Sequence, residues 1–244
     1  MKILILSDLH GNITILDRLR IQIALENPDL VLFCGDIVKG HARGNEWLAA
    51  QKELREARRN LKSIEDEESE DNFYYREFLH FFSAFEFPTC FVPGNMDAPW
   101  SRFWNAFSIT GHRNIHLVHR TFFFLGRTMV YGFGGEISEK NQEDFFVLIY
   151  PRWEVEKAFT KVEAEERIYI FHHPPAGFAT GGSEIIRLII ERDKPMLVAC
   201  GHKHKEAKVE KITESVIINP GPLKEGRFAL FDSNSGEGLL KTID

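Results

Sequence analysis

The sequence predicts an α/β fold, and three features of the chain predict it. A short apolar segment at 2–6 is followed by a helical pattern from about 12 to 26 and by a second apolar segment at 30–33. This is the pattern of two parallel strands joined by a helix. Strand-length apolar segments then alternate with helical segments as far as residue 200. The C-terminal part changes to a series of short strands, expected at 207–212, 216–219, 227–231 and 239–243.

The other elements follow from turn and cap signals. Helices are expected at about 72–85, 99–107, 151–165 and 182–191, with Pro151 at the first position of the third. Strands are expected at 89–92, 116–125, 127–133, 167–171 and 196–200. The chain has no internal repeat and no linker long enough to separate domains, so we expect one domain over 1–244.

Residues 41–70 are expected to form a charged helical insertion in this domain. Apolar residues recur every seven positions in two series, Trp47, Leu54, Leu61 and Ala50, Ala57, Ile64. Such a stripe suits a helix that packs on another helix. A solvated helix is the simplest interpretation of so many charges. The alternative is a helix over 45–68 that packs over a functional site or joins two protomers into a homo-oligomer.

Composition limits the class of protein. Apolar residues make up 43% of the chain and charged residues 27%, and no apolar run approaches the roughly 18 residues that a membrane span needs. The first residues lack the cleavage site of a signal peptide. The net charge of −6 provides no positive field for nucleic acid, and three unpaired cysteines fit a reducing compartment. We therefore expect a cytoplasmic protein with no membrane contact, and we consider nucleic acid an unlikely partner.

Side chains that commonly bind metals follow five of the predicted strands. Because parallel strands end at one edge of a sheet, these side chains should converge there. Taken singly, each has a simpler interpretation as a turn, a helix cap or a solvated loop, but their order along the chain favours a common site. Carboxylates, imidazoles and an amide together suit Mn, Fe, Zn or Ni better than Mg or Ca. The residues are Asp8, His10, Asp36, Asn95, His172, His202 and His204.

The motif order resembles that of the calcineurin-like metallophosphoesterase superfamily. Asp-x-His at 8–10 is followed by Gly-Asp at 35–36, Gly-Asn at 94–95, His at 172 and Gly-His-x-His at 201–204. The resemblance implies a four-layer α/β/β/α sandwich of two mixed sheets flanked by helices. It also implies two divalent metal ions, with manganese as the first expectation, and hydrolysis of a small phosphoester by a hydroxide held between them. The implied ligands are Asp8, His10 and His204 for one ion, Asn95, His172 and His202 for the other, and Asp36 as the bridge.

The third motif departs from the family pattern at Met96. Most members carry a histidine there, which acts as a general acid or orients the phosphate, and a thioether can do neither. Small prokaryotic members that lack this histidine resemble phosphodiesterases, so we expect a phosphodiester to be favoured. His173 or His112 could supply the proton. We expect catalytic roles for Asp36, Asn95 and His173, with substrate contacts from Asn95 and His173.

Three alternatives remain open at this stage. The chain could be a phosphomonoesterase, or a nucleotide pyrophosphatase that uses another acid. It could also be a metal-loaded, nucleotide-binding regulatory protein with little catalysis. A nucleotide is therefore among the expected ligands, and a nuclease is disfavoured by the acidic net charge.

Overall fold

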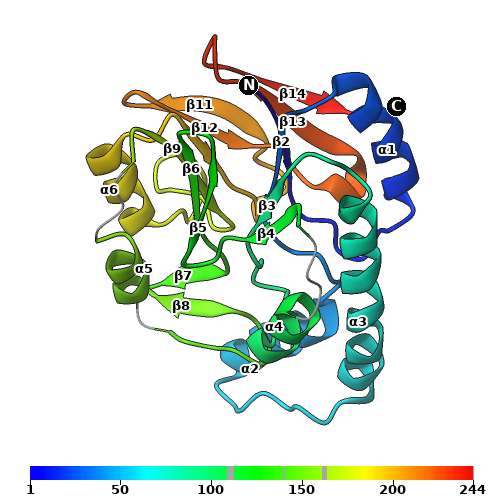
Figure 1. The fold of residues 1–244 in the computed structure, drawn as a ribbon. Coiled ribbons are helices and arrows are strands. Elements are labelled where there is room, and N and C mark those ends of the chain that lie inside the picture. The colour runs from blue at the N-terminus through cyan, green and yellow to red at the C-terminus, as the bar shows by residue number, and fades with distance from the viewer. Residues whose placement is uncertain (109–112, 140, 161–163, 244) are drawn as a thin grey trace.

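Two six-stranded sheets lie face to face in the computed structural model, which describes residues 1–108, 113–139, 141–160 and 164–243 (Figure 1). The strands of the first sheet are β1 (Lys2–Leu6), β2 (Leu30–Phe33), β3 (Thr89–Phe91), β4 (Ile115–Leu117), β13 (Arg227–Asp232) and β14 (Glu237–Thr242). Those of the second are β5 (Phe122–Leu125), β6 (Thr128–Phe133), β9 (Glu166–Phe171), β10 (Leu197–Ala199), β11 (Lys208–Ile212) and β12 (Ser215–Asn219). A small pair is formed by β7 (Glu136–Ser138) and β8 (Ile149–Pro151).

Both sheets are mixed. The first has the order β14-β13-β1-β2-β3-β4, in which β1 to β4 are parallel and β13 and β14 pair antiparallel. The second has the order β11-β12-β10-β9-β6-β5, with β5 and β11 antiparallel at its two edges. The parallel strands occupy the middle of the second sheet and extend from β1 to the edge strand β4 in the first. Their carboxyl ends lie where the metal site is predicted.

Alternating side chains divide the core into three layers. On β1, Leu4 and Leu6 face α1 (Ile15–Glu26), while Ile3 and Ile5 face the other sheet. The outer layer of the first sheet also contains α3 (Lys62–Ser83) and α4 (Trp100–Ser108). The second sheet is covered by α5 (Arg152–Ala158) and α6 (Glu184–Asp193), on the opposite side of the molecule (Figure 1). The predicted four-layer sandwich is confirmed.

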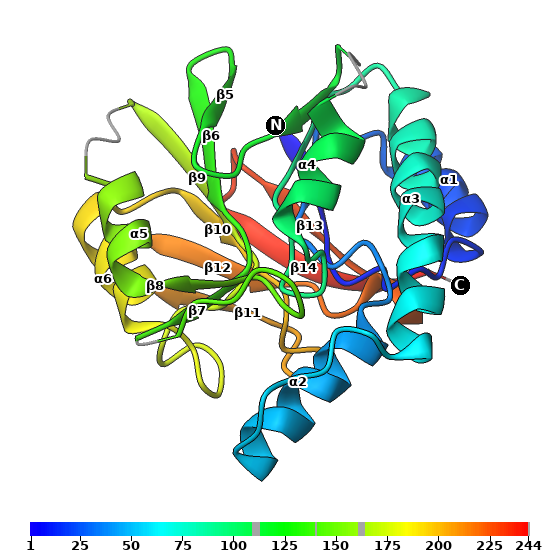
Figure 2. The same ribbon diagram turned by 90° about the horizontal axis from the view of Figure 1, so that it is seen from below.

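The predicted single helix over 45–68 is wrong. Helix α2 (His41–Glu53) is followed by Leu54, which adopts a left-handed conformation and is 95% exposed, and α3 begins only at Lys62. The Glu46 carboxylate accepts hydrogen bonds from the Arg55 guanidinium and from the Arg58 backbone N–H, so the chain turns back against α2. Figure 2 shows α2 projecting from the layered body. Helix α3 continues through the region predicted as a separate helix at 72–85.

Two further predictions need correction. The strand expected at 116–125 is divided between the sheets, since β4 pairs with β3 and β5 pairs with β6. Pro151 closes β8 and caps α5 instead of lying inside the helix, and α5 ends at Ala158. None of the described helices combines the length and apolar character that crossing a bilayer requires.

Candidate metal centre

The seven predicted ligands lie together at the carboxyl ends of five parallel strands. Asp8 and His10 follow β1, Asp36 follows β2 and Asn95 follows β3 in the first sheet. His172 follows β9, and His202 and His204 follow β10, in the second sheet. We call these residues the seven-donor cluster. Both sheets contribute, so the cluster exists only when the two sheets pack together.

The backbone at the cluster is held in unusual conformations. Four of its residues have positive φ, namely Asp8 (59°), His10 (45°), Asp36 (62°) and His202 (67°). Non-glycine residues rarely adopt this region, and such strain concentrates at functional sites. The loops after β1 and β2 stabilise these backbone conformations by hydrogen bonding to each other beyond the ends of the two parallel strands. Asp8 N donates to Gly35 O at 2.9 Å, and His10 N donates to Asp36 O at 3.0 Å.

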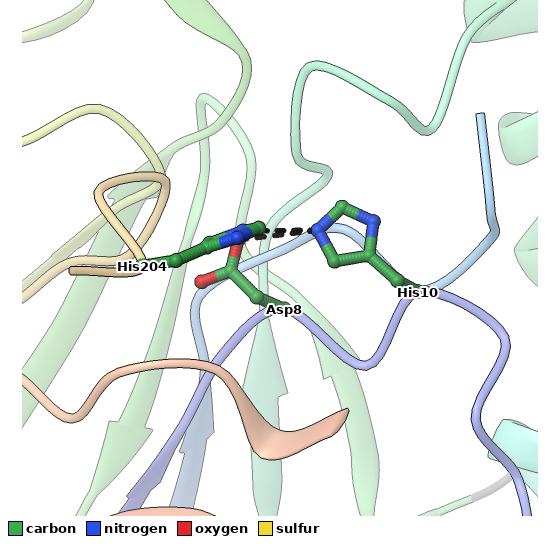
Figure 3. A group of neighbouring side chains, drawn as sticks. All are labelled: Asp8, His10 and His204. Atoms are coloured by element: carbon green, nitrogen blue, oxygen red, sulfur yellow. Dashed lines mark hydrogen bonds and ion pairs between the residues drawn. The ribbon is translucent and has the colours of Figure 1, made fainter. Parts of the chain in front are cut away.

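One group of donors is formed by Asp8, His10 and His204 (Figure 3). The Nε2 atoms of His10 and His204 are 3.1 Å apart, and His204 Nε2 is 3.1 Å from Asp8 Oδ1. Asp8 and His10 are buried, whereas the His204 side chain is 31% exposed. This group therefore opens to solvent on the His204 side.

A second group surrounds Asn95. Its Oδ1 lies 2.9 Å from His172 Nε2 and 3.1 Å from His202 Nδ1. Asp36 stands between the two groups, because its Oδ2 is 3.6 Å from His10 Nε2 and 3.4 Å from His172 Nε2. The other carboxylate oxygen of Asp36 accepts a hydrogen bond from the Met96 backbone N–H at 2.7 Å.

The donor atoms fit divalent cations better than they fit one another. His172 Nδ1 donates to Cys34 O at 2.7 Å, which leaves a lone pair on Nε2 facing the Asn95 carbonyl oxygen. Two facing lone pairs repel unless a cation lies between them, and a hydrogen bond from the other ring nitrogen is the usual support of a histidine ligand. The residues present are therefore suited to metal ions.

Burial and charge set the ionisation of these groups. Burial lowers the pKa of His10 to about 3 and lowers that of His172 and His202, so these imidazoles are neutral and able to bind metal near pH 7. Burial would raise the pKa of Asp8, but the hydrogen bond from His204 and the interactions with His172 and His10 bring it below its usual range. At Asp36, burial and then the charge of Asp8 raise the pKa well above its usual value. Bound cations would relieve the electrostatic repulsion between the Asp8 and Asp36 carboxylates.

Asp97 is a buried residue beside the cluster for which the sequence predicted no role. One of its buried carboxylate oxygens accepts from Gly94 N at 2.7 Å and Asp36 N at 2.9 Å. The other accepts from Ile37 N at 2.9 Å and Val38 N at 3.3 Å. Asp97 thus joins the loops of Asp36 and Asn95. Burial raises its pKa to about 6, although the four N–H donors act to lower it. The sequence signal for this role was the presence of a carboxylate two residues after Asn95 in the third motif.

The Met96 side chain packs against the start of α2. A Cβ at Gly40 would lie 2.5 Å from Met96 Cβ, and one at Gly44 would lie 3.1 Å from its sulfur, so the thioether packs against the start of α2. The next residue, His41, stacks on His10 with ring centroids 5.2 Å apart and planes 23° apart. His41 belongs to none of the sequence motifs, and its approach to His10 depends on the position of α2.

The predicted catalytic and substrate-binding roles of His173 do not fit its surroundings. Its Nδ1 accepts from Ile137 N at 2.8 Å and its Nε2 donates to Gly181 O at 2.9 Å. Burial lowers its pKa to about 4. With both nitrogens bonded to the backbone, His173 joins two loops and has no atom free for a substrate. His112, the other candidate proton donor, lies outside the described residues.

Comparison with known proteins identifies a family and several structures with a similar fold. A family model described as metallophosphoesterase, calcineurin superfamily, matches residues 1–239. One solved structure superposes with a TM-score of 0.89 at 29% identity, over 100% of this chain and 99% of the other. The protein TT1561 of Thermus thermophilus gives a TM-score of 0.77 at 24% identity over 100% and 99% of the two chains. A dimetal phosphatase from Danio rerio gives 0.59 at 11% identity over 100% and 99%. No curated protein matches the chain.

Proposed function

Because the chain belongs to the calcineurin superfamily of metallophosphoesterases, we propose that it is a phosphodiesterase with two divalent metal ions in the seven-donor cluster. Asp8, His10 and His204 would hold one ion, and Asn95, His172 and His202 the other. The observation that carries the proposal is the position of Asp36, whose Oδ2 lies within 3.6 Å of a donor atom in each group. A carboxylate in this place can be shared by two ions.

Two such ions would supply a hydroxide nucleophile near neutral pH and neutralise the charge that develops on the phosphoryl oxygens. The chain itself contributes orientation. Asn95 would contact both a metal ion and the substrate phosphate, and Asp97 holds the loops of Asp36 and Asn95 at a fixed separation. Manganese is the proposed metal, with iron, zinc or nickel as the alternatives that the same mixed donors favour.

The preference for a diester is supported by the described residues that were candidates for donating a proton. Met96 cannot donate a proton, and His173 has both ring nitrogens bonded to the backbone. Burial and then the charge of Lys224 lower the pKa of His41, which keeps this imidazole neutral near pH 7. A substrate whose leaving group departs without a proton is therefore favoured, and activated diesters meet that condition.

The remaining proposals concern the surroundings of the enzyme. The substrate would be a small phosphoester, with nucleotides among the candidates. The exposed Leu48 (65%) and Leu54 (95%) support self-association through 45–68. The three cysteines are buried and free, which supports a reducing, cytoplasmic location.

A paired substrate screen tests the proposed function. Protein loaded separately with Mn, Zn and Ni should hydrolyse bis(p-nitrophenyl) phosphate with a higher kcat/KM than p-nitrophenyl phosphate, which shares its leaving group. A higher value for the monoester would contradict the diester preference. Tight nucleotide binding without hydrolysis of either compound would favour a regulatory protein.

A further inference from the structure

A cavity of about 300 Å³ lies beside the start of α4, and none of the residues that line it belongs to the seven-donor cluster. It is enclosed by the start of α4, the loop after β4, the segment 142–144, and β8 with the first turn of α5. Its lining combines aromatic rings with one histidine, one arginine and three carboxylates. A volume of this order, with an apolar wall and a few polar groups, is that of a binding site for a small molecule.

Aromatic rings in mutual contact form the apolar part of the lining. The His119 ring lies 5.0 Å from the Trp100 ring and 5.3 Å from the Tyr150 ring, measured between centroids. Tyr150 is buried, whereas Trp100 is half-buried. These contacts hold the rings in place before a ligand binds, and the rings can bind an apolar group.

His119 presents a hydrogen-bond donor that has no partner. The residue is only 8% exposed, and Gly134 N donates to its Nδ1 at 2.9 Å. Burial and then the charge of Arg120 lower its pKa well below 6.5, so the ring is neutral and carries its proton on Nε2. No described residue accepts a hydrogen bond from Nε2. Because buried donors are almost always satisfied and His119 lines the cavity, the acceptor has to come from within the cavity.

Two carboxylates of the lining have no cationic partner among the described residues. Glu154 pairs with Arg120, but Glu143 and Asp144 form no ion pair there. Backbone N–H groups fix one oxygen of each, since Asp144 Oδ1 accepts from Trp100 N at 3.0 Å and Glu143 Oε1 accepts from three N–H groups within 3.3 Å. The second oxygen of each carboxylate accepts no hydrogen bond from the part of the chain that the structure describes. The cavity therefore offers two negative charges without a matching cation.

We propose that this cavity binds a small organic ammonium compound that also carries an oxygen acceptor. Glu143 and Asp144 bind the ammonium group, and His119 Nε2 donates to the oxygen. The apolar part of the ligand lies against Trp100 and Tyr150, where a cation close to an aromatic face is stabilised further. An anionic ligand is disfavoured by three carboxylates against one arginine, and a ligand with donors alone would leave the His119 N–H unsatisfied.

Three matched probes test the proposal by calorimetry on the full chain without added metal, so that the result does not depend on the proposed metal centre. Phenylalaninol has an ammonium group, a hydroxyl and a phenyl ring. Hydrocinnamyl alcohol lacks the ammonium group, and phenethylamine lacks the hydroxymethyl group.

Two variants remove one charge each and keep the backbone hydrogen bonds. Asp144→Asn leaves Oδ1 for Trp100 N, and Glu143→Gln leaves Oε1 for its three N–H donors. Asp232→Asn is the matched control, because Asp232 is an exposed carboxylate that also accepts one backbone hydrogen bond and does not line this cavity.

Wild type should bind phenylalaninol about tenfold or more tighter than hydrocinnamyl alcohol, the effect of one charge-assisted hydrogen bond, and about threefold or more tighter than phenethylamine. Asp144→Asn and Glu143→Gln should each reduce the preference for the ammonium group and leave hydrocinnamyl alcohol within about twofold, whereas Asp232→Asn should change neither affinity. No binding of phenylalaninol, or an ammonium preference that persists in both variants, would overturn the proposal. Equal affinity for phenethylamine would overturn the role of His119.

Discussion

Replacing Asp97 with asparagine tests whether a buried carboxylate holds the two halves of the first-sheet site together. Each carboxylate oxygen of Asp97 accepts two backbone N–H groups. An amide keeps one accepting oxygen, and its NH₂ group would face the two remaining donors. Two hydrogen bonds to a charged group are lost, each contributing about 1.5 kcal/mol at the low end, so Asp97→Asn should lower the free energy of unfolding by about 3 kcal/mol.

The loss of stability can be measured by denaturant titration, and metal affinity by competition with a chelator. For a chain of this size, a loss of about 3 kcal/mol corresponds to a decrease in Tm of roughly 6–12 °C. Metal affinity should fall by about tenfold or more, because Asp97 orients the loop of Asp36. Asp232→Asn is the matched control, an exposed carboxylate that accepts one backbone bond from Asn234. A variant with unchanged stability and unchanged metal affinity would refute the role assigned to Asp97.

Three further changes test separate parts of the account. Gly94→Ala would place a Cβ 2.0 Å from Asp36 Oδ1. Displacement of that carboxylate should reduce turnover by about a hundredfold. Near-normal activity would show that the loops of Asp36 and Asn95 can move apart without loss of catalysis. Met96→His should raise monoesterase activity by about tenfold or more relative to diesterase activity, measured with the two p-nitrophenyl esters. An unchanged ratio of the two activities would contradict the proposal that the site favours diesters because Met96 cannot donate a proton. Burial and then the charge of Arg120 lower the pKa of His119 well below 6.5. The unfolded state therefore gains a proton below about pH 6.5 that the native state does not, and stability falls as pH falls. His119→Gln should flatten this slope between about pH 6.5 and 5 by up to about 1.4 kcal/mol per pH unit, and an equal slope in denaturation experiments would contradict the assignment.

The residues of the cluster were predictable because each lies in the loop that follows a strand. Asp8, Asp36 and His172 come immediately or within a few residues after β1, β2 and β9, so finding the strands was enough to place them at one edge. Lys224 and His41 have no such link to a strand of the site. They reach it through a C-terminal turn and the first residue of α2, whose positions depend on contacts between distant parts of the chain.

The helical insertion shows why the rest of the fold was harder to predict. Its seven-residue stripe passes through Leu54 without a proline or glycine to end the helix. The break arises because Glu46 binds Arg55 and Arg58, and a period of seven contains no information on such a pairing. The segment 116–125 was similar, since a strand pattern does not specify which of two sheets the strand joins.

The shared position of Asp36 is the central claim, and metal stoichiometry tests it most directly. Metal-free protein titrated with manganese should bind two ions per chain, since Asp36 Oδ2 lies 3.6 Å and 3.4 Å from donors of the two groups. Asp36→Asn should weaken both binding steps by at least about tenfold, because one residue serves both ions. A single ion in the wild type, or an Asp36→Asn variant in which only one of the two affinities changes, would contradict a metal centre bridged by Asp36.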